Sequence, residues 1–178
     1  MTERRRPDRP EYYMRIAMAV RARANCIGNK VGAVLVRGDR IVSTGYNGTP
    51  QKMKNCDEGG CERCANRDRY PAGQAYDVCV CVHAEQNALL AAARFGIAVE
   101  DAAIYTTMKP CFGCAKQLLQ AGVRGVYYLH EWEPDQEFAA QYEVLVQRFP
   151  EGLARIPTED PDADWAVSRR DVHAGQPG

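Results

Sequence analysis

The first part of the chain changes its hydrophobic period from helical to strand-like. Over residues 11–26 apolar positions recur every three or four residues with arginines between them, which predicts an amphipathic helix. Its apolar face comprises Tyr13, Ile16, Ala17, Val20 and Ala24. Residues 31–36 (VGAVLV) and 40–46 (RIVSTGY) are β-branched runs around Gly38 and Asp39, so a β-hairpin with a tight turn is expected next.

Helical and strand patterns then alternate from residue 83 to residue 157. Helices are expected at residues 83–96, 111–122 and 134–149, and strands at residues 102–108, 124–130 and 152–157. A helix between two strands permits a right-handed parallel crossover, whereas the hairpin is antiparallel. The order therefore predicts an α/β protein, a three-layer α/β/α sandwich around a five-stranded mixed sheet.

Two segments do not follow either period. Residues 49–82 are dense in Gly, Cys and charged residues, and a loop of this length in a compact domain requires something other than an apolar core to order it. We expect one domain over residues 1–157 that contains this Cys-rich insertion. Residues 158–178 predict a poorly ordered C-terminal tail, apart from a docking contact at Trp165.

Composition and charge narrow the classes of function. The 178 residues are 46% hydrophobic and carry 23 Lys plus Arg against 23 Asp plus Glu, so no net positive field attracts a polyanion. Nucleic acid is therefore an unlikely partner, and a small diffusing substrate fits better. There is no long apolar run for a membrane helix and no apolar core behind the basic N-terminus, so we expect no membrane contact, no signal peptide and a cytoplasmic location. In a reducing compartment the eight cysteines indicate metal binding or redox chemistry rather than disulfides.

Four residues have the spacing of a catalytic zinc site. His83 opens one predicted helix, while Cys111 and Cys114 lie three apart in the first turn of the next, where both sulfurs can reach one ion. One His and two Cys leave the fourth tetrahedral position for water, whose pKa the metal and the helix N-termini lower. Glu85 is well placed to exchange a proton with that water. His83 alone would more often be a structural histidine, but this combination favours zinc.

These motifs also resemble a known family. H-x-E followed by P-C-x-x-C is the zinc deaminase signature, here His83 to Glu85 and Pro110 to Cys114. Together with VGAVLV, STGYNGTP, HAEQNALLAAA and PCFGCAKQLLQAGV in this order, they resemble the deoxycytidylate (dCMP) deaminase family over about residues 12–130. The resemblance implies a cytidine deaminase-like fold and hydrolysis of dCMP to dUMP by a zinc-bound hydroxide, with Glu85 as the proton shuttle.

The resemblance also suggests substrate contacts. It implies that Asn47 contacts the sugar and that Tyr105 lies near the base, although Asn47 is also an ordinary turn residue and Tyr105 an ordinary core residue. Ala84 is a small residue whose backbone can face the base. Candidates for the phosphate contact are Lys52, Lys54, Arg69 and Lys109. Relatives of this kind imply a homo-oligomer, and hexamers occur among them.

The remaining cysteines predict a second metal. Some dCMP deaminases carry an extra metal bound by cysteines that correspond to Cys26 and Cys56. The hypothesis is a structural zinc held by four of Cys26, Cys56, Cys61, Cys64 and Cys79. The alternatives are packing thiols or a redox pair at Cys61 and Cys64, and Cys81 is assigned to packing. Other functions also remain open: a deaminase of another small amino-pyrimidine or purine compound, a catalytically silent zinc-stabilised nucleotide-binding module, or an enzyme that edits polynucleotides.

Overall fold

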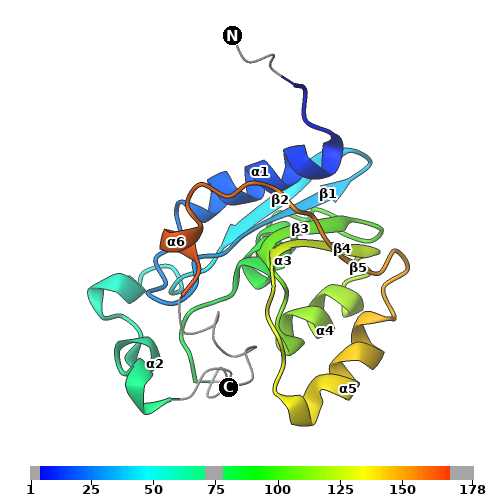
Figure 1. The fold of residues 1–178 in the computed structure, drawn as a ribbon. Coiled ribbons are helices and arrows are strands. Elements are labelled where there is room, and N and C mark those ends of the chain that lie inside the picture. The colour runs from blue at the N-terminus through cyan, green and yellow to red at the C-terminus, as the bar shows by residue number, and fades with distance from the viewer. Residues whose placement is uncertain (1–4, 71–77, 169–178) are drawn as a thin grey trace.

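A five-stranded mixed sheet forms the centre of the molecule. The computed structural model describes residues 5–70 and 78–168. The strands are β1 (Gly32–Arg37), β2 (Arg40–Tyr46), β3 (Ala103–Met108), β4 (Gly125–His130) and β5 (Leu153–Arg155). Their order is β2-β1-β3-β4-β5, with β1 antiparallel to both β2 and β3, and with β3, β4 and β5 parallel to one another (Figure 1). The prediction of a five-stranded mixed sheet is confirmed.

Helices cover both faces of this sheet. α1 (Arg9–Arg21) lies on one face, and α3 (Ala84–Arg94), α4 (Phe112–Gln120) and α5 (Gln136–Val146) lie on the other (Figure 1). The three-layer α/β/α sandwich is therefore confirmed. Short helical pieces complete the described chain: η1 (Cys56–Glu58), α2 (Glu62–Ala65), η2 (Arg67–Arg69) and α6 (Ala163–Ala166). None of the helices within residues 5–70 and 78–168 has the length and apolar character needed to cross a membrane.

The first helix is shorter than its sequence pattern. α1 ends at Arg21, although the periodicity extends to residue 26. Beyond this helix the backbone of Asn25 donates to the carbonyl of Asn47, 3.2 Å away, so tertiary contacts with the loop after β2 replace the last helical turn. The hairpin turn agrees with its sequence, because Gly38 and Asp39 both have positive φ angles of 54° and 60°, as a two-residue β-hairpin turn of this kind requires.

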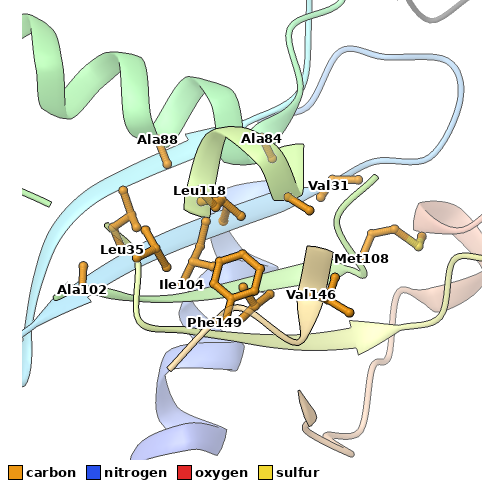
Figure 2. Close-up of a cluster of buried hydrophobic side chains, with 14 of the residues drawn as sticks. Val31, Leu35, Ala84, Ala88, Ala102, Ile104, Met108, Leu118, Val146 and Phe149 are labelled. Atoms are coloured by element: carbon orange, nitrogen blue, oxygen red, sulfur yellow. The ribbon is translucent and has the colours of Figure 1, made fainter. Parts of the chain in front are cut away.

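Strand alternation divides the apolar side chains into two cores. Leu35 and Ile104 point to the face covered by α3, α4 and α5, where they pack with Leu118 and Phe149 (Figure 2). Val34 lies on the face covered by α1. Because neighbouring residues of a strand point to opposite faces, each position of β1 and β3 is committed to one core.

A close backbone contact fixes the start of α3 against the sheet. A Cβ atom built on Gly45 of β2 would lie 2.2 Å from the carbonyl oxygen of Ala84 and 2.4 Å from the nitrogen of Ala88, so only glycine fits there. Ala84 and Ala88 are completely buried in this contact. This contact fixes the distance between the first turn of α3 and β2.

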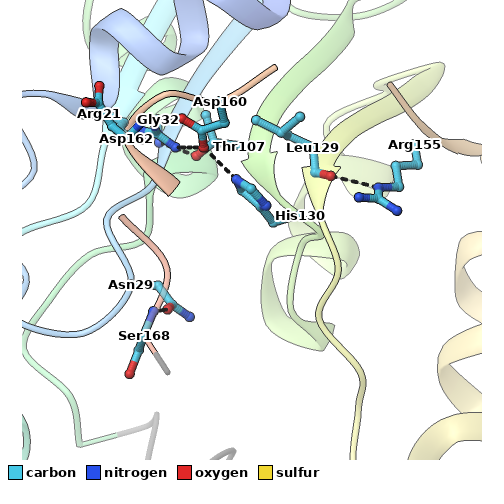
Figure 3. Close-up of polar contacts among 10 residues, drawn as sticks. All are labelled: Arg21, Asn29, Gly32, Thr107, Leu129, His130, Arg155, Asp160, Asp162 and Ser168. Atoms are coloured by element: carbon cyan, nitrogen blue, oxygen red, sulfur yellow. Dashed lines mark hydrogen bonds and ion pairs between the residues drawn. The ribbon is translucent and has the colours of Figure 1, made fainter. Parts of the chain in front are cut away.

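The expectation of a poorly ordered tail is wrong for residues 158–168. Asp160 accepts hydrogen bonds from both terminal nitrogens of Arg21, and its carboxylate lies 2.6 Å from Nε2 of His130 (Figure 3). The backbone of Ser168 donates to the side chain of Asn29 at 2.7 Å. The side chain of Trp165 is about half exposed, and the Lys30 ammonium lies 5.0 Å from the centre of its ring. Residues 169–178 lie outside the described residues.

Asp160 forms a buried ion pair with Arg21. The Arg21 and Asp160 side chains are only 1% and 4% exposed. Burial raises the pKa of Asp160, but the hydrogen bonds from Arg21 and His130 lower it more, to about 2. This folded-state value lies below the unfolded value of about 4, so the stabilisation is present above about pH 4 and is lost as the pH falls toward 2.

We predict that Asp160→Asn lowers the free energy of unfolding at pH 7 by roughly 3–5 kcal/mol, because it leaves the buried Arg21 guanidinium without a counter-charge. Urea titrations at pH 7 and pH 3 measure this, and the loss should shrink at pH 3, where the wild-type carboxylate begins to bind protons. Glu159→Gln changes an exposed carboxylate of the same tail and should alter stability little. Equal effects of the two substitutions would contradict the role of the ion pair.

Candidate active site and metal centres

Two helix N-termini bring the four predicted catalytic residues together. His83 is the residue that caps α3, and Glu85 lies in the first turn of that helix. Cys111 caps α4, and Cys114 lies in its first turn. The backbone N–H of His83 donates to the side chain of Gln86 at 3.0 Å, which fixes the capping residue. Exposed backbone N–H groups and the helix dipoles therefore favour negative charge at this point.

The ligand atoms have the separations of a tetrahedral zinc site. The sulfurs of Cys111 and Cys114 each lie 3.4 Å from Nδ1 of His83. Zinc bonds of ordinary length at a tetrahedral angle place sulfur and nitrogen about 3.6 Å apart. A hydrogen bond from Cys114, together with the field of His83, lowers the pKa of Cys111 to about 4, so its thiolate is favoured. The residues fit a zinc ion, with Nδ1 as the histidine donor.

Glu85 is a buried carboxyl group next to this set of ligands. Its side chain is 4% exposed and accepts a hydrogen bond from the hydroxyl of Thr106, 3.2 Å away. Burial raises its pKa above the ordinary value of a glutamate. A carboxyl group with a raised pKa holds a proton at a higher pH than an exposed one does, as a proton carrier near neutrality requires.

A cavity opens beside these residues. On one side it is lined by His83, Glu85 and Cys111, and on another side by cysteines of the insertion and of the chain that leads to α3. Asn47 and Ala84, which the sequence suggested as substrate contacts, also line it. The contacts of Asn47 show a structural role as well: its oxygen accepts from the backbone of Val31 and its amide donates to the carbonyl of Asn29, both at 2.8 Å.

The expectation that Tyr105 lies near the base needs correction. Tyr105 points to the face of the sheet covered by α1, where it packs against Tyr13 and stacks on Tyr127 with ring centres 4.8 Å apart. Its neighbour Thr106 points to the other face and contacts Glu85. The sheet thus separates Tyr105 from the cavity. From the same strand, Met108 lines the cavity and Thr106, which was not selected from the sequence, contacts Glu85.

The basic residues of the cavity differ from most of those expected. Of the four candidates for a phosphate contact only Lys109 lines the cavity, whereas Lys52, Lys54 and Arg69 do not. Arg63 and Arg67 line it instead, and the sequence analysis missed both. The sequence did contain an indication for Arg63, because this residue lies between Cys61 and Cys64, and a metal bound by these cysteines would fix its position.

Six cysteines outside this site form two overlapping groups. Within each group the four sulfurs lie within 4.8 Å of one another. The groups are Cys26, Cys56, Cys64 and Cys81, and Cys61, Cys64, Cys79 and Cys81. Neither group lies within the five cysteines proposed from the sequence, because both include Cys81. Cys81 was assigned to packing from the sequence, and it is buried, but its sulfur lies within reach of both groups, so it is also a candidate metal ligand.

The chain is similar to known deaminases. Residues 7–130 match the model of the cytidine and deoxycytidylate deaminase zinc-binding region. A deoxycytidylate deaminase of Schizosaccharomyces pombe is 41% identical over 135 residues, which are 76% of this chain and 41% of that protein. A deoxycytidylate deaminase of Mycobacterium phage D29 is 37% identical over 134 residues, 71% of this chain and 98% of that protein. The chain spans about two fifths of the length of the yeast relatives that it matches.

Solved structures agree with the sequence comparison. The dCMP deaminase of cyanophage S-TIM5, solved in complex with dCMP and dUMP, superposes with a TM-score of 0.64 at 29% identity and covers 86% of this chain and 100% of its own. The family model covers more than half of this chain, and the matched region includes His83, Cys111 and Cys114, which the fold brings together. The chain belongs to the cytidine and deoxycytidylate deaminase zinc-binding family.

Proposed function

We propose that this chain catalyses the hydrolytic deamination of dCMP to dUMP, a step of pyrimidine nucleotide biosynthesis. The observation that carries the proposal is the convergence of His83, Cys111 and Cys114 on one point, with the buried Glu85 beside them and a cavity in front. The similarity to deoxycytidylate deaminases of yeast and phage supports dCMP as the substrate.

His83, Cys111 and Cys114 would hold the catalytic zinc. When bound, zinc supplies Lewis acidity that lowers the pKa of a coordinated water and provides a nucleophile near neutral pH. The chain's own part is to offer two thiolates and Nδ1 of His83 at fitting distances, and to leave one face of this set toward the cavity.

Glu85 moves the protons of the reaction. In the proposed sequence its carboxylate takes a proton from the attacking water and gives it to N3 of the cytosine ring. It then takes the proton of the new C4 hydroxyl and gives it to the amino group, so the C4–N bond breaks, ammonia leaves and the C4 carbonyl of dUMP forms. The hydroxyl of Thr106 holds one carboxylate oxygen, so the other is oriented for transfer. Burial excludes bulk water, which would otherwise compete for these protons.

Asn47, the backbone of Ala84 and two arginines would position the nucleotide. Asn47 keeps hydrogen-bonding capacity for the sugar beyond its two backbone partners. Arg63 and Arg67 suit the phosphate because a guanidinium binds it in a bidentate manner. Lys109 is less suited, since Glu131 and Glu133 lie 3.5 and 3.4 Å from its ammonium.

The proposal also includes a cellular location and an oligomeric state. All eight cysteines are free, which is consistent with a reducing, cytoplasmic location. A homo-oligomer, with a hexamer as the form to test, is supported by exposed apolar side chains on and after α3, namely Leu90 and Phe95 at 58% and 72% exposure. Light scattering after size exclusion measures this assembly.

We predict that ammonia release is fastest with dCMP in a panel that also contains CMP, dCTP, deoxycytidine, cytosine and guanine. The phosphate contact should make dCMP at least about tenfold better in kcat/KM than deoxycytidine, because charge-assisted hydrogen bonds are each worth roughly 1.5–3 kcal/mol. A clear preference for cytosine, guanine or a ribonucleotide would overturn dCMP as the substrate. No turnover of any compound by the zinc-loaded protein would overturn the enzymatic function.

We predict that Glu85→Gln lowers kcat by about 10²–10⁴-fold, because the amide cannot carry the protons while its volume is unchanged. Bound zinc and thermal stability should stay at the wild-type level, as metal analysis and circular dichroism would show. Glu100→Gln alters an exposed carboxylate beyond α3 and serves as the matched control. An active Glu85→Gln enzyme would contradict the proton-carrier role.

We predict that Cys111→Ser loses the catalytic zinc and all measurable turnover, since a serine hydroxyl is a far weaker zinc ligand than a thiolate at neutral pH. Metal analysis after dialysis should find one zinc ion fewer per chain than in the wild type. Cys111 sits at the cap of α4 with an adjoining cavity, so the fold should persist. Unchanged zinc content would exclude Cys111 as a ligand.

A further inference from the structure

Six of the eight cysteines form one compact cluster outside the catalytic site. We call Cys26, Cys56, Cys61, Cys64, Cys79 and Cys81 the thiol cluster. They come from the segment after α1, which holds Cys26, and from the two ends of the Cys-rich insertion, residues 56–64 and 79–81. Five of the six are buried, and Cys79 is half-buried.

The cluster is arranged as two sets of four that share an edge. Cys64 and Cys81 belong to both sets, Cys26 and Cys56 complete the first, and Cys61 and Cys79 complete the second. The sulfur of Cys79 lies 3.7 Å from that of Cys61 and 3.7 Å from that of Cys64. Two thiolates on one tetrahedral zinc ion are expected about 3.8 Å apart. Two sulfur separations of the second set thus match those of a zinc site, and all of its sulfurs lie within 4.8 Å of one another.

Apolar packing does not explain this arrangement. Within residues 49–70 and 78–82, the described part of the insertion, every buried residue is a cysteine: Cys56, Cys61, Cys64 and Cys81. The only other apolar side chain that packs on the cluster within the described residues is Val80, which is partly buried. So little apolar area cannot order a segment of this length, whereas a structural metal site contributes folding free energy directly.

Ligand counting distinguishes one ion from two. A single ion takes four thiolates and leaves two more thiols inside the same cluster, with no apolar surroundings to explain their burial. Two tetrahedral ions that share two ligands need eight minus two, or six, cysteines, which is the number present. Six thiolates carry a charge of −6 and two zinc ions +4, so the net charge falls to −2. Six cysteines around two zinc ions are also the composition of the Zn₂Cys₆ modules.

We propose that the thiol cluster holds two zinc ions bridged by Cys64 and Cys81, in addition to the catalytic ion. Cys26 and Cys56 complete the first ion, and Cys61 and Cys79 complete the second. The inference extends the proposed structural zinc to a binuclear centre. It rests on the arrangement of the sulfurs and is independent of which nucleotide is the substrate.

The binuclear centre would form one wall of the substrate cavity. Cys26, Cys64, Cys79 and Cys81 line the same cavity as His83 and Glu85. Arg63 lies between two ligands of the second ion, Cys61 and Cys64. Arg67 lies three residues after Cys64 and donates to the carbonyl of Ile27 at 3.0 Å. The ions would therefore hold in place the arginines proposed for the phosphate.

The first test is the zinc content of the purified, full-length protein. We expect three zinc ions per chain in the wild type, measured by elemental analysis and by native mass spectrometry. Cys111→Ser should retain two, which separates the cluster from the catalytic site. Two ions in the wild type and one in Cys111→Ser would overturn the binuclear centre.

Matched cysteine variants test which ligands are shared. Cys61→Ala removes a ligand of the second ion only and should lower the zinc content from three to two. Cys81→Ala removes a bridging ligand of both ions and should lower it from three to one. Equal losses in the two variants would overturn the bridging assignment.

A measurement on the wild type avoids variants that fail to fold. X-ray absorption at the zinc edge of the wild type should show a zinc–zinc distance of about 3 Å, which follows from two tetrahedra that share two sulfurs. If no zinc–zinc distance of this length is observed, the proposal that two cysteines bridge two zinc ions is overturned. Zinc content and dCMP turnover are measured on the same preparation, so their failures are distinguishable: three ions without turnover reject the function alone, and full turnover with two ions rejects the cluster alone.

Discussion

The convergence of ligand atoms from separate helices on one point is the constraint on which the structure depends. A zinc site requires sulfur and nitrogen donors about 3.6 Å apart, and here they come from the capping residues of α3 and α4. The sheet sets this distance. α3 packs on β2 through the contact of Gly45 with Ala84, while α4 starts four residues after the end of β3. The order of the strands therefore determines where His83 meets Cys111.

The sequence predicted those features that depend on residues close together along the chain. Each helix and strand has its own period, and the motifs around Glu85 and Cys114 span only a few residues, so the element order and the catalytic set could both be recognised. Tyr105 could not be placed in this way. It lies one position from Thr106, and neighbouring residues of a strand face opposite sides, so only the observed register decides which of them reaches Glu85.

Contacts between distant residues account for the other errors. Arg21 and Asp160 are 139 positions apart, and the residues near Asp160 in the sequence do not indicate that it pairs with a buried guanidinium. The tail therefore resembles a solvated segment until the fold brings the pair together. The same applies to Cys81, because only the fold shows that its sulfur lies within 4.8 Å of those of both Cys26 and Cys61.

Charge links the thiol cluster to the proposed reaction. A cluster of six thiolates and two zinc ions keeps a net charge of −2, and a nucleotide monophosphate brings a further −1.5 to −2 at neutral pH. Both would border the same cavity, where water screens their repulsion poorly. Arg63 and Arg67 come from the very segment that the cluster orders, so they can offset the charge of the cluster and bind the phosphate. In this arrangement the Cys-rich insertion has two roles although it lacks an apolar core. The proposed metal ions would make the segment rigid, and its arginines would supply the positive charge that binds the substrate phosphate.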